Sequence, residues 1–87
     1  MPNYQQLISE NLYTEALEEL EKLLIEYPND DKLLFDRGKL RWRLGDRSGA
    51  TSDYAKAALK NPNGPAIKAL ENAQDIADFF NPDLYNP

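Results

Sequence analysis

Five side chains within one predicted helix, residues 31–44, have the types expected of a binding surface. They are Lys32, Phe35, Lys39, Trp42 and Arg43. The last four follow Lys32 by 3, 7, 10 and 11 positions, which puts all five on one side of a helix. Two aromatic rings flanked by three cations suit a ligand with apolar side chains and acidic groups, such as an extended peptide. Aromatic residues and arginine are also enriched at binding hot spots.

The alternative interpretation is that the two aromatic residues belong to the core. A chain of 87 residues buries only a modest fraction of its surface on folding, so it has a thin core. Every large aromatic side chain is then valuable for packing. Phe35 and Trp42 would in that case be buried against the short first helix or the C-terminal tail.

The residue types that most catalytic and metal sites use are missing. The sequence contains no cysteine and no histidine, which excludes disulfides, thiolate metal sites, histidine-based metal sites and the usual catalytic triads. We therefore expect no enzymatic activity, no cofactor and no bound metal.

Charge is distributed unevenly along the chain, although the net charge is −5. A basic run follows an acidic segment that bears Glu15, Glu18, Glu19, Glu21 and Glu26. The basic residues are Arg37, Lys39, Arg41, Arg43 and Arg47. One interpretation is mutual neutralisation between neighbouring helices, and the other is an acidic partner that docks on the basic helix. Overall acidity argues against nucleic acid as a ligand, because phosphate binding needs excess positive charge.

The sequence also bears on location. Its first six residues have neither a basic start nor an apolar run, and no stretch approaches the ~20 apolar residues of a membrane span. We expect no secretory signal, no membrane partner and a cytoplasmic location.

An internal repeat appears when the chain is compared with itself at an offset of 34 residues. Seven pairs of identical or chemically similar residues then coincide. The pairs are Asn11 and Gly45, Ala16 and Ala50, Leu20 and Tyr54, Lys22 and Lys56, Ile25 and Leu59, Pro28 and Pro62, and Asn29 and Asn63. Seven matches at one offset predict two copies of one structural unit.

The second unit predicts two antiparallel helices. Gly45 can end the first helix, because glycine tolerates the left-handed conformation of a helix C-terminus, and Asp46 can cap the second helix. The small residues Gly38, Ala50 and Ala57 predict close approach of the two helices. Leu34 and Tyr54 are expected to fill the space between them.

These residues resemble a tetratricopeptide repeat. The resemblance covers the whole second unit and rests on the motif residues Leu34, Arg37, Gly38, Leu44, Gly45, Asp46, Ala50, Asp53, Tyr54, Lys56, Ala57 and Pro62. Arg41 departs from the family pattern, which usually has a large aromatic or apolar residue at this position. The first unit resembles the family through Ala16, Leu20, Leu23 and Pro28, with a truncated opening helix. The arrangement is similar to small stand-alone bacterial repeat proteins.

The resemblance implies an all-α fold, a right-handed superhelix of α-α hairpins with about two repeat units and a C-terminal capping helix. We expect one domain over residues 1–80, with units at about 1–30 and 31–64, a capping helix at 65–80 and a tail at 81–87. The expected helices span about 3–10, 13–27, 31–44, 47–60 and 65–80. In the last helix an apolar stripe is expected to cover the second unit. The stripe is Ile67, Leu70, Ala73, Ala77 and Phe80.

In this family the first helix of each hairpin lines a concave face. The resemblance therefore places Lys32, Phe35, Lys39, Trp42 and Arg43 in a concave basic-aromatic groove. We expect a protein-interaction module that binds a peptide or protein segment there. The alternative is a structural subunit that associates with itself, so we expect a monomer or a weak homodimer.

The tail after residue 80 is unusually apolar for a chain end. Leu84 and Tyr85 follow Asn81-Pro82, which should stop the helix. We expect the tail to fold back onto the domain. The alternatives are a free recognition segment and an exchange with a second molecule.

Overall fold

The computed structural model describes the backbone of residues 3–80 and the side chains of residues 3–73. Over residues 3–80 the chain forms five helices and no strand. They are α1 (Tyr4–Ser9), α2 (Tyr13–Glu26), α3 (Asp31–Arg43), α4 (Arg47–Lys60) and α5 (Ala66–Phe80). The predicted all-α class is confirmed, and no predicted helix boundary differs from the observed one by more than one residue. The predicted tail, residues 81–87, lies outside the described residues.

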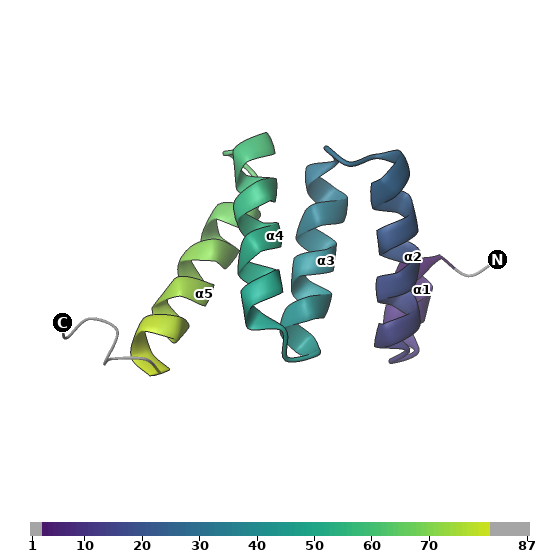
Figure 1. Ribbon diagram of the computed structural model, residues 1–87, viewed down its shortest axis with the longest axis horizontal. Helices are drawn as coiled ribbons and strands as arrows, with labels where there is room; N and C mark the ends of the chain where they lie inside the picture. Colours follow the sequence, from purple (N-terminus) through teal and green to yellow (C-terminus); the bar gives the residue numbers. More distant parts are fainter. Residues whose placement is uncertain (1–2, 81–87) are drawn as a thin grey trace.

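Short connections make each helix pack against its neighbour in the chain. In Figure 1, α2, α3 and α4 stand side by side, with α3 running opposite to the other two, and α1 lies behind α2. The fifth helix packs against α4 on the side away from α2. This order places α3 in the middle of the layer, between α2 and α4.

Local sequence determines where the helices begin and end. Asn3, Asp30 and Asp46 each precede a helix, and their side chains accept hydrogen bonds from backbone N–H groups in its first turn. Gly45 has a φ of 93° and Asn11 has a φ of 62°, so both residues adopt the left-handed conformation predicted for them at the ends of α3 and α1.

The core holds α3 and α4 in close contact. Ala50 is completely buried and Ala57 and Tyr54 are nearly so, as predicted. A Cβ atom at Gly38 would lie 2.6 Å from Cε1 of Tyr54 and 3.3 Å from the carbonyl oxygen of Ala50. Only glycine therefore fits at position 38 without a shift of the neighbouring helix.

Positions related by the 34-residue offset have the same burial on α2 and α4. Ala16 and Ala50 are both 0% exposed, and Leu20 and Tyr54 are both buried. The two helices therefore turn the same sequence positions toward the core. By the same correspondence they turn the same positions toward solvent.

The start of α5 packs differently from the prediction. Ala66 and Ala73 are buried and Leu70 is half-buried, but Ile67 is 37% exposed. The buried line follows positions 66, 69, 70 and 73, so Ile67 falls at the edge of the contact with α4. The predicted stripe is therefore wrong at Ile67. The side chains of Ala77 and Phe80 lie outside the described residues.

Candidate functional site

Four of the five predicted binding residues surround two adjoining hollows on one face of α3. Lys32, Phe35 and Lys39 line one hollow, and Lys39 and Arg43 line the other. The two hollows share Asp36 and Lys39, so they lie next to each other along the helix. We call the two hollows together the α3 groove. The fifth residue, Trp42, lines a third hollow between α3, α4 and α5.

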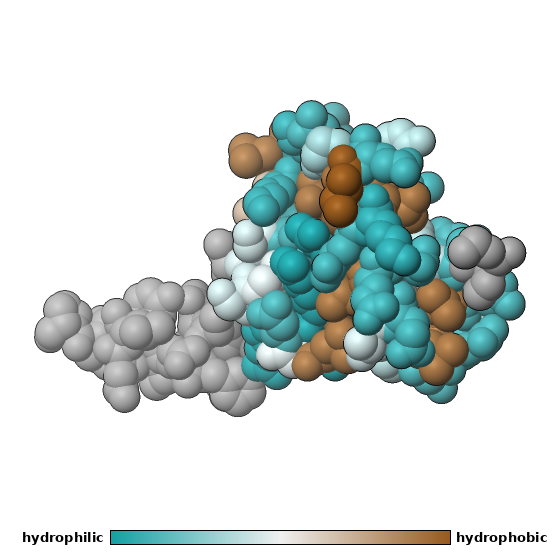
Figure 2. All heavy atoms as spheres, turned by 45° about the vertical axis from the view of Figure 1, so that its right-hand side comes forward, coloured by the Kyte–Doolittle hydropathy of each residue, from teal (hydrophilic) through white to brown (hydrophobic). Residues whose placement is uncertain are grey.

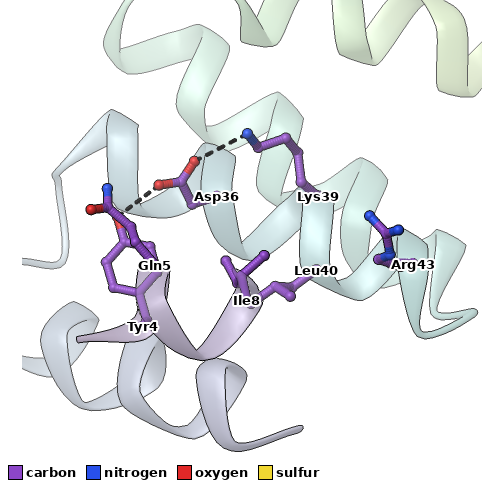
Figure 3. Close-up of a pocket in the computed structure, with 7 residues that line it drawn as sticks. All are labelled: Tyr4, Gln5, Ile8, Asp36, Lys39, Leu40 and Arg43. Carbon is purple, nitrogen blue, oxygen red and sulfur yellow. Dashed lines mark hydrogen bonds and ion pairs between the residues drawn. The ribbon is translucent and has the colours of Figure 1, made fainter. Parts of the chain in front are cut away.

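The first hollow lies between α1 and α3 and has a volume of about 300 Å³ (Figure 3). Ile8 and Leu40 face each other across it and provide apolar surface. Lys39 and Arg43 lie along its α3 side. Arg43 also covers the ring of Tyr13, with its guanidinium carbon 4.9 Å from the ring centre. This hollow therefore combines an apolar floor with two cations.

The second hollow lies between the start of α3 and the start of α5, and has a volume of about 420 Å³. Phe35 provides its aromatic surface, and the exposed Lys32 lies at its edge. The ammonium group of Lys39 lies 4.9 Å from the centre of the Phe35 ring. Pro65 and Ala66 close the hollow on the α5 side. Like the first hollow it combines apolar surface with cations, and the carboxylates of Asp31 and Asp36 also line it.

Asp36 connects α1 to the groove. Its carboxylate accepts a hydrogen bond of 2.7 Å from the hydroxyl of Tyr4 and lies 3.6 Å from the Lys39 ammonium (Figure 3). Burial and this hydrogen bond raise the pKa of Tyr4 from 10.0 to about 12. A six-residue helix is too short to be stable alone, so this contact and the burial of Tyr4 hold α1 in place.

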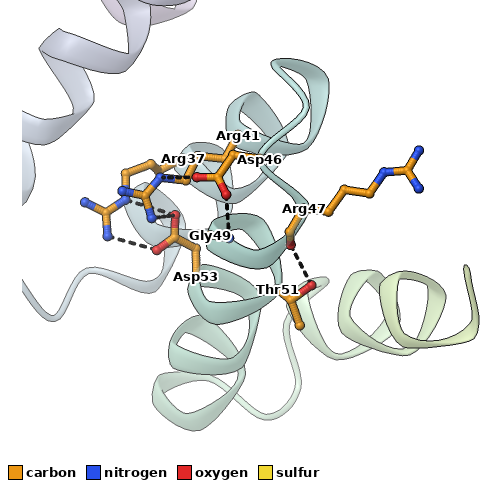
Figure 4. A network of polar contacts seen from close by, with 7 residues as sticks. All are labelled: Arg37, Arg41, Asp46, Arg47, Gly49, Thr51 and Asp53. Carbon is orange, nitrogen blue, oxygen red and sulfur yellow. Dashed lines mark hydrogen bonds and ion pairs between the residues drawn. The ribbon is translucent and has the colours of Figure 1, made fainter. Parts of the chain in front are cut away.

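Two arginines of the basic run point away from the groove and bind a buried carboxylate on α4 (Figure 4). Arg37 donates through Nε and Nη2 to both oxygens of Asp53, at 2.9 and 2.8 Å. Arg41 donates to the same carboxylate at 3.2 Å. Asp53 is 0% exposed, so this network neutralises a charge that would otherwise be buried without a partner.

This network is a finding that sequence reasoning missed. One interpretation of the sequence paired the whole basic run with the glutamates of residues 15–26, but Arg37 and Arg41 bind Asp53 instead. Their spacing of four residues puts both on one face of α3. An aspartate among the small residues of the facing helix was the available signal. The same contact explains how an arginine is accommodated at position 41, where an apolar residue was expected.

The two aromatic residues have a packing role as well as an exposed surface. Both are half-buried rather than fully buried. The Phe35 ring lies 5.7 Å from the Tyr54 ring, and Trp42 packs against the cluster of Ala50, Tyr54 and Ala73. The guanidinium of Arg47 lies 5.0 Å from the centre of the Trp42 ring. Trp42 therefore belongs to the α4–α5 side of α3 rather than to the groove.

Among the described residues, no group of three or more acidic side chains could hold a metal ion. In the same part of the chain, no helix is both long enough and apolar enough to cross a membrane. No family model matches the sequence, and no curated protein matches it.

Proposed function

We propose that this chain is a protein-interaction module that binds an acidic and apolar peptide segment in the α3 groove. The observation that carries the proposal is that the basic residues of α3 lie on two different faces of the helix. Arg37 and Arg41 are committed to Asp53, whereas Lys32, Lys39 and Arg43 surround two hollows with apolar floors.

The shape of the groove favours an extended peptide over a compact ligand. The hollows follow one another along α3 and share only Asp36 and Lys39. Alternate side chains of an extended segment point in the same direction, about 6.5–7 Å apart. Two such side chains can enter the two hollows while the backbone between them crosses the shared residues.

The charges of the groove favour acidic side chains in the partner. Lys32 makes no ion pair within the described part of the chain, and Arg43 is engaged only with the neutral ring of Tyr13. The Lys39 ammonium is 3.6 Å from Asp36, but its side chain remains 58% exposed. Each of these cations can reach an acidic group on a bound segment without breaking a buried contact.

We also propose that the helices form a right-handed superhelix of tetratricopeptide-type hairpins. Three features support the proposal. Equivalent positions of α2 and α4 have the same burial, Gly38 permits close contact with Tyr54, and α3 runs opposite to both neighbours. In such an arrangement α1, α3 and α5 would line one concave face, and residues of these three helices line the groove.

A panel of synthetic peptides tests the binding proposal. Each peptide has about ten residues with leucine or phenylalanine at alternate positions and aspartate between them, and its control carries lysine in place of aspartate. Binding is measured by fluorescence anisotropy of a labelled peptide. We expect the aspartate peptides to bind and the lysine peptides not to bind. Equal binding of both series, or of neither, would contradict the proposal.

Matched charge reversals locate the binding surface. Lys39→Glu with Arg43→Glu places two acids beside the first hollow and should abolish capture of the aspartate peptides. Lys56→Glu with Lys60→Glu changes the net charge equally on the exposed side of α4, outside the groove, and should leave capture intact. Both variants should retain the helical circular dichroism spectrum, because exposed charges contribute little to stability.

A further inference from the structure

Two aliphatic side chains are almost fully exposed at matching positions of α2 and α4. Ile25 is 81% exposed and Leu59 is 82% exposed, and they are the most exposed large hydrophobic side chains in the described part of the chain. They are related by the same 34-residue offset that relates the buried faces of the two helices. Figure 2 shows that the visible face is mainly hydrophilic, with separate hydrophobic patches, one of which protrudes near its upper end.

The residues around these two side chains carry opposite charges on the two helices. On α2 the exposed neighbours of Ile25 include Glu21 and Glu26, and further exposed glutamates lie earlier in the helix. On α4 the exposed neighbours of Leu59 are Lys56 and Lys60. None of these four charged residues forms an ion pair within the part of the chain that the structure describes.

We propose that these two surfaces bind each other between two copies of the chain. In a homodimer with two-fold symmetry, α2 of each copy packs against α4 of the other, so the same contact forms twice. Ile25 of one copy then covers Leu59 of its partner. The mainly acidic surface of α2 meets the basic surface of α4, whereas pairing of α2 with α2 would bring two acidic surfaces together.

The register of the repeat is compatible with this arrangement. Helices α2 and α4 run in the same direction (Figure 1), so a two-fold axis parallel to the helices places α2 alongside α4 of the partner. The offset that matches Ile25 with Leu59 also matches Glu26 with Lys60. Lys22 matches Lys56, but its ammonium is bound to Glu19 at 3.3 Å.

The proposed dimer and the proposed peptide binding use different surfaces, so either can hold without the other. None of the residues that line the α3 groove belongs to the exposed surfaces of α2 or α4 described above. A second copy is favoured over an unrelated protein because one chain carries both complementary halves of the surface.

The apolar part of the contact is tested by measuring mass against concentration. Sedimentation equilibrium from the low micromolar to the millimolar range should show a reversible dimer. Leu59→Ser should raise the dissociation constant about tenfold or more, because the leucine is buried only in the dimer and the contact occurs twice. Leu44→Ser removes an exposed leucine at the C-terminal end of α3, far along the helices from Leu59, and should have no effect. A monomer at every concentration would overturn the proposal, as would a dimer that Leu59→Ser leaves unchanged.

The charged part is tested by a charge exchange. Lys56→Glu with Lys60→Glu should abolish the dimer, because both facing surfaces become acidic. Adding Glu21→Lys with Glu26→Lys in the same chain should restore it. If the variant with all four substitutions remains monomeric while retaining its helical spectrum, the assignment of α2 as the partner of α4 is overturned. Lys39→Glu with Arg43→Glu should leave the dimer intact, so the dimer and peptide binding can fail separately.

Discussion

Replacing Asp53 by asparagine measures the contribution of the buried carboxylate. Asp53→Asn preserves the size of the side chain, so it removes charge without creating a cavity. The carboxylate accepts three hydrogen bonds from Arg37 and Arg41, at 2.8–3.2 Å. In asparagine an NH₂ group replaces one carboxylate oxygen, and its N–H donors would face the N–H donors of the arginines. Breaking a buried ion pair costs about 3–5 kcal/mol. The two arginine side chains are 16% and 25% exposed, so water can solvate them in part. We therefore expect a loss of about 3 kcal/mol in the free energy of unfolding.

Urea and thermal unfolding monitored by circular dichroism test this value. In a domain of this size each 1 kcal/mol shifts the Tm by roughly 4–8 °C, so the Tm should fall by more than about 10 °C. Asp46→Asn is the matched control. Asp46 is 55% exposed, its ion pair with Arg41 is 3.9 Å long, and asparagine caps a helix as well as aspartate does. The control should change stability by less than about 0.5 kcal/mol. Equal melting of the Asp53→Asn variant and the wild type would refute the role assigned to the network.

Two further predictions concern the core and the α1 contact. Gly38→Leu should destabilise the chain by about 1–3 kcal/mol in urea unfolding, because a Cβ atom alone already collides with Tyr54. Ser52→Leu, at an exposed position of α4, should stay within about 0.5 kcal/mol of the wild type. Folding raises the pKa of Tyr4 from 10.0 to about 12, so its contribution to stability is complete below pH 10 and is lost as the pH rises toward 12. Tyr4→Phe should make the loss of stability over this pH range smaller, and an unchanged pH dependence would contradict the assignment.

The helices and their ends could be predicted from sequence because the signals are local. Gly45 and Asp46 occupy the turn between α3 and α4, and each residue's own chemistry determines its conformation or its cap. The close contact at Gly38 could also be predicted, because the small residues Gly38, Ala50 and Ala57 indicate where the two helices of the second unit touch.

The contacts that shape the candidate site could not be predicted in the same way. The hydrogen bond from Tyr4 to Asp36 joins residues that are 32 positions apart, and the bonds from Arg37 to Asp53 join residues 16 positions apart. Charge alone does not say which of several acidic residues a given arginine will meet. Sequence analysis therefore treated five basic residues as one set, although the fold turns two of them inward. Trp42 was grouped with the groove for a similar reason. Helical spacing indicates which residues share a side of α3, but it does not indicate which neighbouring helix packs against that side.

The central claim is that the α3 groove binds an acidic, apolar peptide. Its most direct test is a titration of the ¹⁵N-labelled protein with one aspartate–leucine peptide, followed residue by residue by NMR. We expect saturable shifts at Lys32, Phe35, Asp36, Lys39 and Arg43, with amides at the exposed positions of α2 and α4 unchanged. Shifts confined to α2 and α4, or spread evenly over the chain, would contradict the account.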